Sequence, residues 1–262
     1  MKTYSFAYGS GTVELPLDEK NVIGELHGNA VAPLADIRAA LWASLDAPID
    51  SAPLCERARA GDTVALVVSD MTRFWMRQDL VVPHLVDYLT ERCGVREEDI
   101  TIVIANGTHI GGDEQELRTL VTDAVYDRVK VKNHDCEAKD LVYLGTTPHG
   151  TPVSINRTAA EADLVVCLGA VTHHVMAGFG GGRKSILPGI CSQETVNENH
   201  SYKAISSPYA NTGVLEHNPI HEDMLAAAKM VNVQFIFNVA LDGQKKIIAA
   251  WAGDLEKAHA EG

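Results

Sequence analysis

The segment TVALVVSD (residues 63–70) is a continuous run of apolar residues that stops at Ser69 and Asp70. An apolar run without alternation is typical of a parallel strand that is buried on both faces. Two further segments have the same character, ITIVI (residues 100–104) and DLVVCL (residues 163–168). We therefore predict that these three segments are central strands of one sheet.

Helical patterns separate the predicted strands. Apolar residues recur at spacings of three and four over 34–45 and 80–89, and helices are also predicted over 113–121 and 219–231. A strand is predicted at 235–241, weaker strands at 129–131 and 141–144, and short β-like runs at 4–8 and 13–15. Strands that alternate with helices imply right-handed crossovers. The predicted fold class is therefore α/β, a mainly parallel, Rossmann-like sheet flanked by helices, with a β-rich N-terminal segment.

Composition and charge exclude several classes of protein. The chain has 262 residues with 22 basic and 35 acidic side chains, so 22 − 35 gives a net charge of −13. We expect no non-specific binding to nucleic acid, because neutralising phosphates requires a basic face. No apolar segment near Met1 predicts a signal peptide, and the longest apolar stretch, 164–171, is too short for a bilayer, so no membrane partner is expected. The five scattered cysteines form no CxxC pair, which favours a reducing, cytoplasmic location.

Polar clusters follow the three strong strands. They lie at 70–73, 106–109 and 173–184. Because open α/β sheets bind ligands at the carboxyl ends of their strands, we expect the three clusters to meet in one cleft.

The third cluster contains the glycine-rich segment GFGGGRKS (residues 178–185). Closely spaced glycines let backbone N–H groups approach an anion, and Arg183 and Lys184 add positive charge. The segment misses the P-loop pattern because Arg183 stands where that pattern has glycine. A phosphate-loop nucleotide-binding or phosphotransfer protein, a non-catalytic anion-binding module and a simple flexible turn are the alternatives. Of the adjacent His173 and His174, at most one is expected to face the cleft.

Single residues of these clusters have both a functional and a structural interpretation. Asp70 is suited either to bind a ribose hydroxyl or to cap the N-terminus of a helix. Arg73 is suited either to bind a carboxylate or to lie exposed to solvent. His109 suits acid/base catalysis or a surface hydrogen bond. His200 suits a single ligand to a soft metal, although one histidine does not make a metal site.

Together these motifs resemble the lactate racemase family, whose enzymes use a nickel-pincer nucleotide. The resemblance rests on blocks at residues 70–73, 105–109, 174, 178–188, 199–200, 218–219 and 253–254. It spans essentially the whole chain, but only the N-terminal domain of the family. It implies that residues 1–262 form the N-terminal catalytic and cofactor-binding domain of a two-domain protein. The C-terminal domain, which adds substrate contacts and a lid in the family, is the partner missing from this chain.

The resemblance also implies individual roles. Lys184 matches the lysine that carries the cofactor covalently, a nickel(II) pyridinium-3,5-bisthiocarboxylic acid mononucleotide, and His200 matches the protein ligand of the nickel ion. His109 and His174 match the paired acid/base histidines. Arg73 matches a residue beside the substrate carboxylate. The implied cofactor-binding residues are Lys184, Asp70, Met71, Thr72, Arg73, Gly181 and Gly182.

The implied activity is racemisation or epimerisation of a small 2-hydroxy acid, by default lactate. One histidine takes the hydroxyl proton while hydride passes transiently to the cofactor and returns to the other face of the flat keto acid. Phe74-Trp75 and His217 depart from the family pattern, and these differences bear on the substrate more than on the cofactor. We expect a chain made without the cofactor-synthesis enzymes to lack the cofactor and activity.

Overall fold

The computed structural model describes residues 1–231 and 233–262. They divide into two compact units, Met1–Val31 and Ala32–Gly262. The first unit contains an antiparallel hairpin of β1 (Lys2–Tyr8) and β2 (Gly11–Leu17) and a short 3-10 helix at Glu19–Asn21. The predicted β-rich N-terminal segment is therefore present.

The second unit is built on a six-stranded sheet. Five strands run parallel in the order β11-β8-β3-β4-β5, and β12 adds an antiparallel edge beside β11. The bounds are β3 (Val64–Ser69), β4 (Ile100–Ala105), β5 (Lys130–Asn133), β8 (Leu164–Ala170), β11 (Phe235–Leu241) and β12 (Ile247–Gly253). The predicted α/β fold with a mainly parallel sheet is confirmed.

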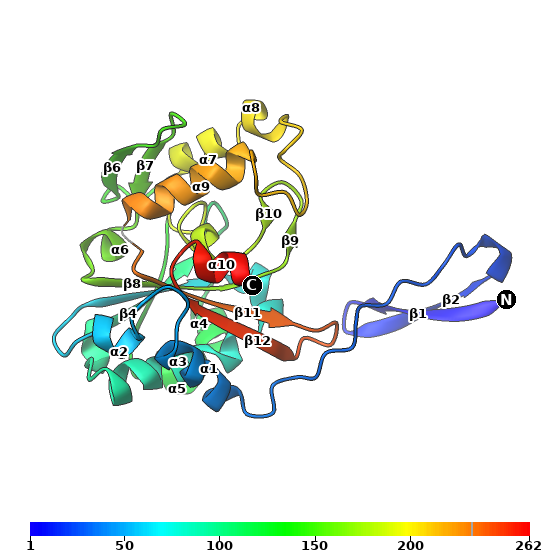
Figure 1. The fold of residues 1–262 in the computed structure, drawn as a ribbon, viewed down its shortest axis with the longest axis horizontal. Helices are drawn as coiled ribbons and strands as arrows, with labels where there is room; N and C mark the ends of the chain where they lie inside the picture. Colours follow the sequence, from blue (N-terminus) through cyan, green and yellow to red (C-terminus); the bar gives the residue numbers. More distant parts are fainter. Residues whose placement is uncertain (232) are drawn as a thin grey trace. The chain divides into compact units, whose positions relative to one another are not determined.

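Helices cover both faces of this sheet (Figure 1). One face packs against α1 (Ile37–Asp46), α2 (Leu54–Arg57), α3 (Val82–Asp87), α4 (Glu114–Val121) and α5 (Asp123–Tyr126). The other packs against α6 (Arg157–Glu161), α7 (Gln193–Asn199), α8 (Tyr202–Ile205), α9 (Pro219–Met230) and α10 (Lys257–Glu261). Two small antiparallel pairs complete the unit, β6 (Val142–Thr146) with β7 (Pro152–Ile155) and β9 (His173–His174) with β10 (Gly178–Phe179).

The continuous apolar runs are explained by this arrangement. In β3, Leu66 and Val68 point into the core on one face, while Ala65 and Val67 point into the core on the other. All four side chains are fully buried. A strand that is covered on both faces cannot alternate between apolar and polar residues.

Some elements differ from the sequence prediction. The periodic segment at 80–89 is not one α-helix: a 3-10 turn at Gln78–Leu80 precedes α3, and a π-helical turn at Tyr88–Arg92 follows it. Pro83 lies in the first turn of α3, where its missing N–H is tolerated. Strand β12 was not predicted because its sequence, IIAAWAG, is alanine-rich. The Asp242-Gly243 pair between two apolar runs is the hairpin signal that indicates it.

The strand order creates a topological switch point. From β3 the chain proceeds to β4 and β5 on one side, then returns to β8 on the other side of β3 and continues to β11. The loops that leave β3 and β8 therefore diverge, and a crevice opens between them at the carboxyl ends of the strands. No described helix, in either unit, has the length and apolarity needed to cross a bilayer.

The burial of the sheet on both faces leads to a prediction about stability. Ile102, which is 0% exposed in β4, and Ile110, which is 96% exposed, offer the same chemical change in opposite environments. We expect Ile102→Ala to lower the free energy of unfolding by about 2–5 kcal/mol and Ile110→Ala by less than about 0.5 kcal/mol. Chemical denaturation followed by circular dichroism measures both, and equal losses would contradict the burial described above.

Candidate functional site

A cavity of about 320 Å³ lies at the switch point. Ser69, Ala105 and Gly169 line it from the ends of β3, β4 and β8. The three polar clusters predicted to meet in one cleft all reach this cavity. Of the predicted site residues, it is lined by Arg73, His109, His174, Gly181, Lys184 and His200. The remaining four, Asp70, Met71, Thr72 and Gly182, lie outside its lining.

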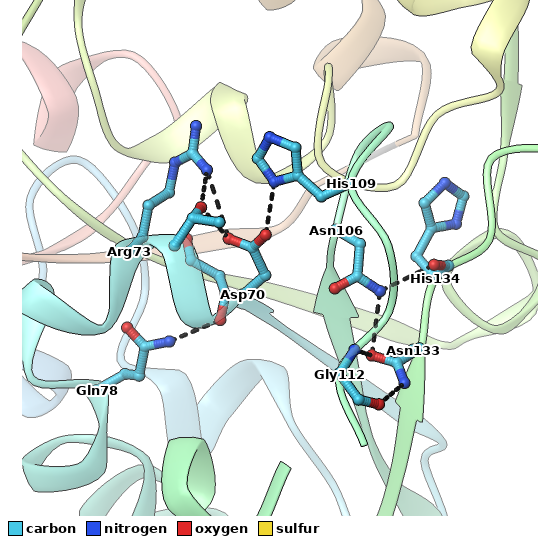
Figure 2. A network of polar contacts seen from close by, with 10 residues as sticks. Asp70, Arg73, Gln78, Asn106, His109, Gly112, Asn133 and His134 are labelled. Atoms are coloured by element: carbon cyan, nitrogen blue, oxygen red, sulfur yellow. Dashed lines mark hydrogen bonds and ion pairs between the residues drawn. The ribbon is translucent and has the colours of Figure 1, made fainter. Parts of the chain in front are cut away.

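His109 is paired with a buried carboxylate. Its Nδ1 lies 2.6 Å from Oδ2 of Asp70, whose side chain is only 6% exposed (Figure 2). Because an ionised carboxylate can only accept, Nδ1 of His109 donates this hydrogen bond. The neutral ring then carries its lone pair on Nε2, so His109 is held as a proton acceptor. The Asp70 charge also stabilises the ring once it has taken up a proton.

The other oxygen of Asp70 is also occupied. Its Oδ1 accepts a hydrogen bond of 2.7 Å from Thr72 Oγ1 and lies 3.4 Å from a guanidinium nitrogen of Arg73 (Figure 2). Asp70 precedes the 3-10 helix Met71–Met76, but its side chain caps no backbone N–H there. The side chain of Met71 packs against the hydrophobic core. The carboxylate of Asp70 therefore contacts the protein's own side chains rather than pointing freely into the cavity.

Hydrogen bonds from two asparagines hold the loop that carries His109 in place. Asn106 donates to Asn133 Oδ1 at 3.1 Å and to the His134 carbonyl at 2.9 Å (Figure 2). Asn133 in turn accepts from the Gly112 N–H at 3.2 Å and donates to the Gly112 carbonyl at 2.7 Å. These contacts close the loop at both ends, and they were not anticipated from the sequence.

His174 has the opposite arrangement. Its Nδ1 accepts hydrogen bonds from the backbone N–H groups of Ala177 at 3.2 Å and Met176 at 3.5 Å. The proton of the neutral ring therefore lies on Nε2, the reverse of His109. The neighbouring His173 is exposed and packs on the Phe179 ring, with the ring centroids 5.0 Å apart. Only one of the adjacent histidines faces the cavity, as predicted.

The glycine-rich loop wraps around a buried guanidinium. Arg183, 1% exposed, donates to the carbonyls of Ala177 and Phe179, both at 3.0 Å, and to His259 Nε2 at 2.6 Å. The expectation that Arg183 presents its charge to a bound anion is therefore wrong. Its hydrogen bonds are directed at the loop carbonyls, and they hold the loop in place.

The loop's N–H groups are also largely used within the protein. Gly180 N donates to the Thr172 carbonyl at 2.7 Å, Gly182 N to Asn238 Oδ1 at 3.0 Å, and Lys184 N to the Gly181 carbonyl at 3.2 Å. A cradle for phosphate needs such groups free. Gly181 is required for space, because a Cβ on it would lie 2.8 Å from Asn238 Oδ1.

Lys184 places an amine in the cavity without a counter-ion among the described residues. Burial, and then the charges of Arg73 and Arg183, lower the pKa of Lys184 to about 7. A large fraction of this amine is therefore uncharged near neutral pH, and an uncharged amine is a nucleophile.

His200 follows α7 and lines the same cavity. Its Nδ1 is buried and has no hydrogen-bond partner in the described structure, which leaves Nε2 as the nitrogen that reaches the cavity. Burial, followed by the charge of Lys184, lowers the pKa of His200, so the ring is neutral and able to bind a metal. Nowhere in residues 1–231 and 233–262 do three His, Cys, Asp or Glu side chains gather as a metal site. A metal at His200 therefore needs further ligands from a bound group.

The cavity is electropositive although the chain as a whole is acidic. Burial, and then the charges of Lys184 and Arg73, lower the pKa of His174 to about 4. The same two cations favour an anionic ligand in the cavity, against the net charge of −13.

The fold and cavity define an α/β protein with titratable side chains gathered at the switch point of its sheet. The family model for the lactate racemase N-terminal domain matches residues 8–213. The chain therefore belongs to this family.

Curated relatives and solved structures agree with this assignment. The lactate racemases of Thermoanaerobacterium thermosaccharolyticum and Lactiplantibacillus plantarum are 35% and 37% identical to the chain over its full length. The chain spans 62% of the length of each relative. The apoprotein structure of the T. thermosaccharolyticum lactate racemase superposes with a TM-score of 0.88 at 34% identity, covering 100% of this chain and 61% of that one. A Thermotoga maritima crystal structure shares the fold, with a TM-score of 0.66 at 23% identity over 79% of this chain and 55% of that one.

The environment of Lys184 gives a testable pH dependence. We expect acetylation of Lys184 by an amine-specific reagent to rise with pH around a midpoint of about 7, because only the neutral amine reacts. Arg73→Gln removes a like charge, so the midpoint should move to higher pH. Peptide mass spectrometry measures the labelling, with the exposed Lys203 as an internal reference. An unchanged midpoint in the Arg73 variant would contradict the charge effect.

Proposed function

We propose that this chain is the N-terminal, cofactor-carrying domain of a racemase that acts on a small 2-hydroxy acid, with lactate as the first substrate to test. The observation that carries the proposal is the pair of imidazoles in one cavity whose cavity-facing nitrogens are in opposite states, a lone pair on His109 and a proton on His174. The relatives named lactate racemase support it. Since they are longer than this chain, we assign the activity to the whole protein, with a second domain as partner.

The residues present fit a nickel-pincer nucleotide. The nucleophilic amine of Lys184 would carry the group covalently, and Nε2 of His200 would supply the single protein ligand to nickel. A lone imidazole suffices only if the group brings its own sulfur and carbon donors, as this cofactor does. When bound, this cofactor would supply an electrophilic ring carbon that can accept hydride reversibly.

Arg73 is suited to hold the substrate carboxylate. One terminal guanidinium nitrogen is directed at Thr72 Oγ1, 2.6 Å away, and at Asp70. In the described structure the other guanidinium nitrogens donate no hydrogen bond, so they are available to a planar carboxylate. Trp75 and Met76 line the cavity beside Arg73, and they would limit the size of the substrate side chain.

His109 would accept the hydroxyl proton at Nε2. The carboxylate of Asp70 keeps the ring in the correct tautomer and compensates the positive charge that develops on it. His174 would serve the opposite face of the substrate.

The pKa of about 4 for His174 applies while Lys184 still carries a charge. Acylation of that amine would remove the Lys184 charge, and a bound carboxylate would offset the charge of Arg73. Both changes would raise the pKa of His174 from about 4, while the effect of burial, which is the largest cause of the shift, would remain.

The phosphate-loop alternative has less support. The N–H groups of Gly180, Gly182 and Lys184 bond within the protein, and Arg183 is buried. A nucleotide phosphate would therefore find few donors in this loop.

The test of the function is racemisation by the full-length enzyme, produced together with the cofactor-synthesis enzymes and assayed on a panel of 2-hydroxy acids. We expect conversion of one enantiomer to the racemate, a mass increase on Lys184, and nickel in the protein. Lys184→Ala should lose the mass increase, the nickel and the activity, whereas Lys203→Ala should keep all three. Full nickel loading of the Lys184 variant would refute the anchoring role.

The acid/base roles predict a graded series of variants. In the loaded enzyme, His109→Ala and His174→Ala should each lower kcat by at least about 10²-fold, because a positioned proton-transfer group contributes about 10²–10⁴-fold. His173→Ala, at the exposed neighbour, should be unaffected. Since Asp70 acts through His109, adding Asp70→Asn to His109→Ala should cause little further loss. Retention of activity by both single histidine variants would exclude the two-base scheme.

A further inference from the structure

A buried carboxylate outside the cavity lies close to the proposed nickel ligand. Asp223, in α9, is 3% exposed. Its Oδ1 accepts a hydrogen bond of 2.6 Å from Thr147, and its Oδ2 accepts bonds of 2.7 Å from Thr151 and 2.8 Å from Asn199. No cation pairs with it in the described part of the chain. The negative charge is thus compensated entirely by three neutral donors.

These donors come from two separate segments. Thr147 and Thr151 belong to the turn that joins β6 to β7, and Asn199 is the last residue of α7. The Asn199 amide also donates to the Ile220 carbonyl in α9, at 3.3 Å. The carboxylate of Asp223 therefore fixes the carboxyl end of α7 against α9.

His200 depends on this end of α7 for its position. Its backbone N–H donates to the Val196 carbonyl at 2.9 Å, but its ring makes no hydrogen bond within the described structure. Metal-binding histidines usually donate their second ring N–H to a carboxylate or carbonyl, which orients the ring. At His200 that group is absent, so the backbone and packing must orient the ring. The residue directly before it, Asn199, is held by its side-chain bonds to Asp223 and to the Ile220 carbonyl.

We propose that Asp223 is a positioning residue for His200, acting through Asn199 to hold the imidazole where nickel is bound. The inference rests on the proposed function, in which His200 is the nickel ligand. A carboxylate suits this place because it accepts from all three donors at once, whereas a side chain with a donor of its own would oppose one of them.

The experiment compares two variants of the same network. Asn199→Ala removes the bonds from α7 to Asp223 and to the Ile220 carbonyl and leaves the carboxylate with both threonines. Thr147→Val removes a bond of similar length to the same carboxylate, and two bonds that its hydroxyl accepts within the turn, without touching α7. In the loaded full-length enzyme, nickel loss to a chelator should be about 10-fold faster in Asn199→Ala, in line with the effect of other outer-shell partners on metal affinity. Thr147→Val should lose nickel at the wild-type rate. The Lys184 adduct, measured by mass, should be unchanged in both.

Asp223→Asn serves as the conservative variant. Its amide oxygen can still accept from Asn199 if the amide nitrogen turns toward the Thr147 hydroxyl, so nickel retention should stay near wild type. Melting temperatures of all variants separate general loosening from the specific effect, since Thr147→Val should lower Tm without releasing nickel.

A second measurement uses the cofactor-free chain. Deuterium exchange at the ring C2 of His200 reports the exposure of the imidazole, and it should be faster in Asn199→Ala but not in Thr147→Val. Wild-type nickel retention in Asn199→Ala, or equal nickel loss in both variants, would overturn the positioning role. If the wild-type enzyme carries no Lys184 adduct, the proposed function fails, and the exchange experiment still decides whether Asn199 orients His200.

Discussion

The guanidinium of Arg183 organises the glycine-rich loop on which the site depends. A buried cation is costly unless it is hydrogen-bonded, and here the loop carbonyls of Ala177 and Phe179 both accept from one terminal nitrogen of the guanidinium, whereas its Nε has no partner in the described structure. The loop must therefore curl around the side chain, which only closely spaced glycines permit. The next residue, Lys184, is thereby directed into the cavity. His259 extends the same support from α10, 76 residues further along the chain.

This arrangement concentrates positive charge around the cavity, and that charge helps to lower the pKa values of the groups that line it. Burial, and then the charges of Arg73 and Arg183, lower the pKa of Lys184. Burial, and then the charge of Lys184, lower the pKa of His174 and His200. The two imidazoles are therefore neutral near pH 7, whereas Lys184 is divided between its charged and uncharged forms. Groups that would repel one another when charged therefore lie close together at the place where a ligand is expected.

The sequence predicted the sheet and the meeting of three clusters well, because both follow from local patterns. Apolar runs identified β3, β4 and β8, and the rule for open α/β sheets placed their loops at one edge. Side-chain partners far apart in sequence could not be inferred in this way. The Asp70–His109 contact spans 39 residues, and the burial of Arg183 depends on packing from both sides. A cation in a glycine-rich loop indicated a contact with an anion, because the local pattern does not show that the Arg183 guanidinium is buried against the loop carbonyls.

The unequal support of the two imidazoles has a consequence for chirality. His109 is braced by a carboxylate and by the asparagines behind its loop, whereas His174 rests on a two-residue strand pair. Mirror-image substrates have the same free energy in solution, so an enzyme that interconverts them cannot favour either one at equilibrium. Under the proposed racemisation, the asymmetry of the protein would appear only as a difference in how the two enantiomers occupy the enzyme. One enantiomer would saturate the enzyme at a lower concentration than the other.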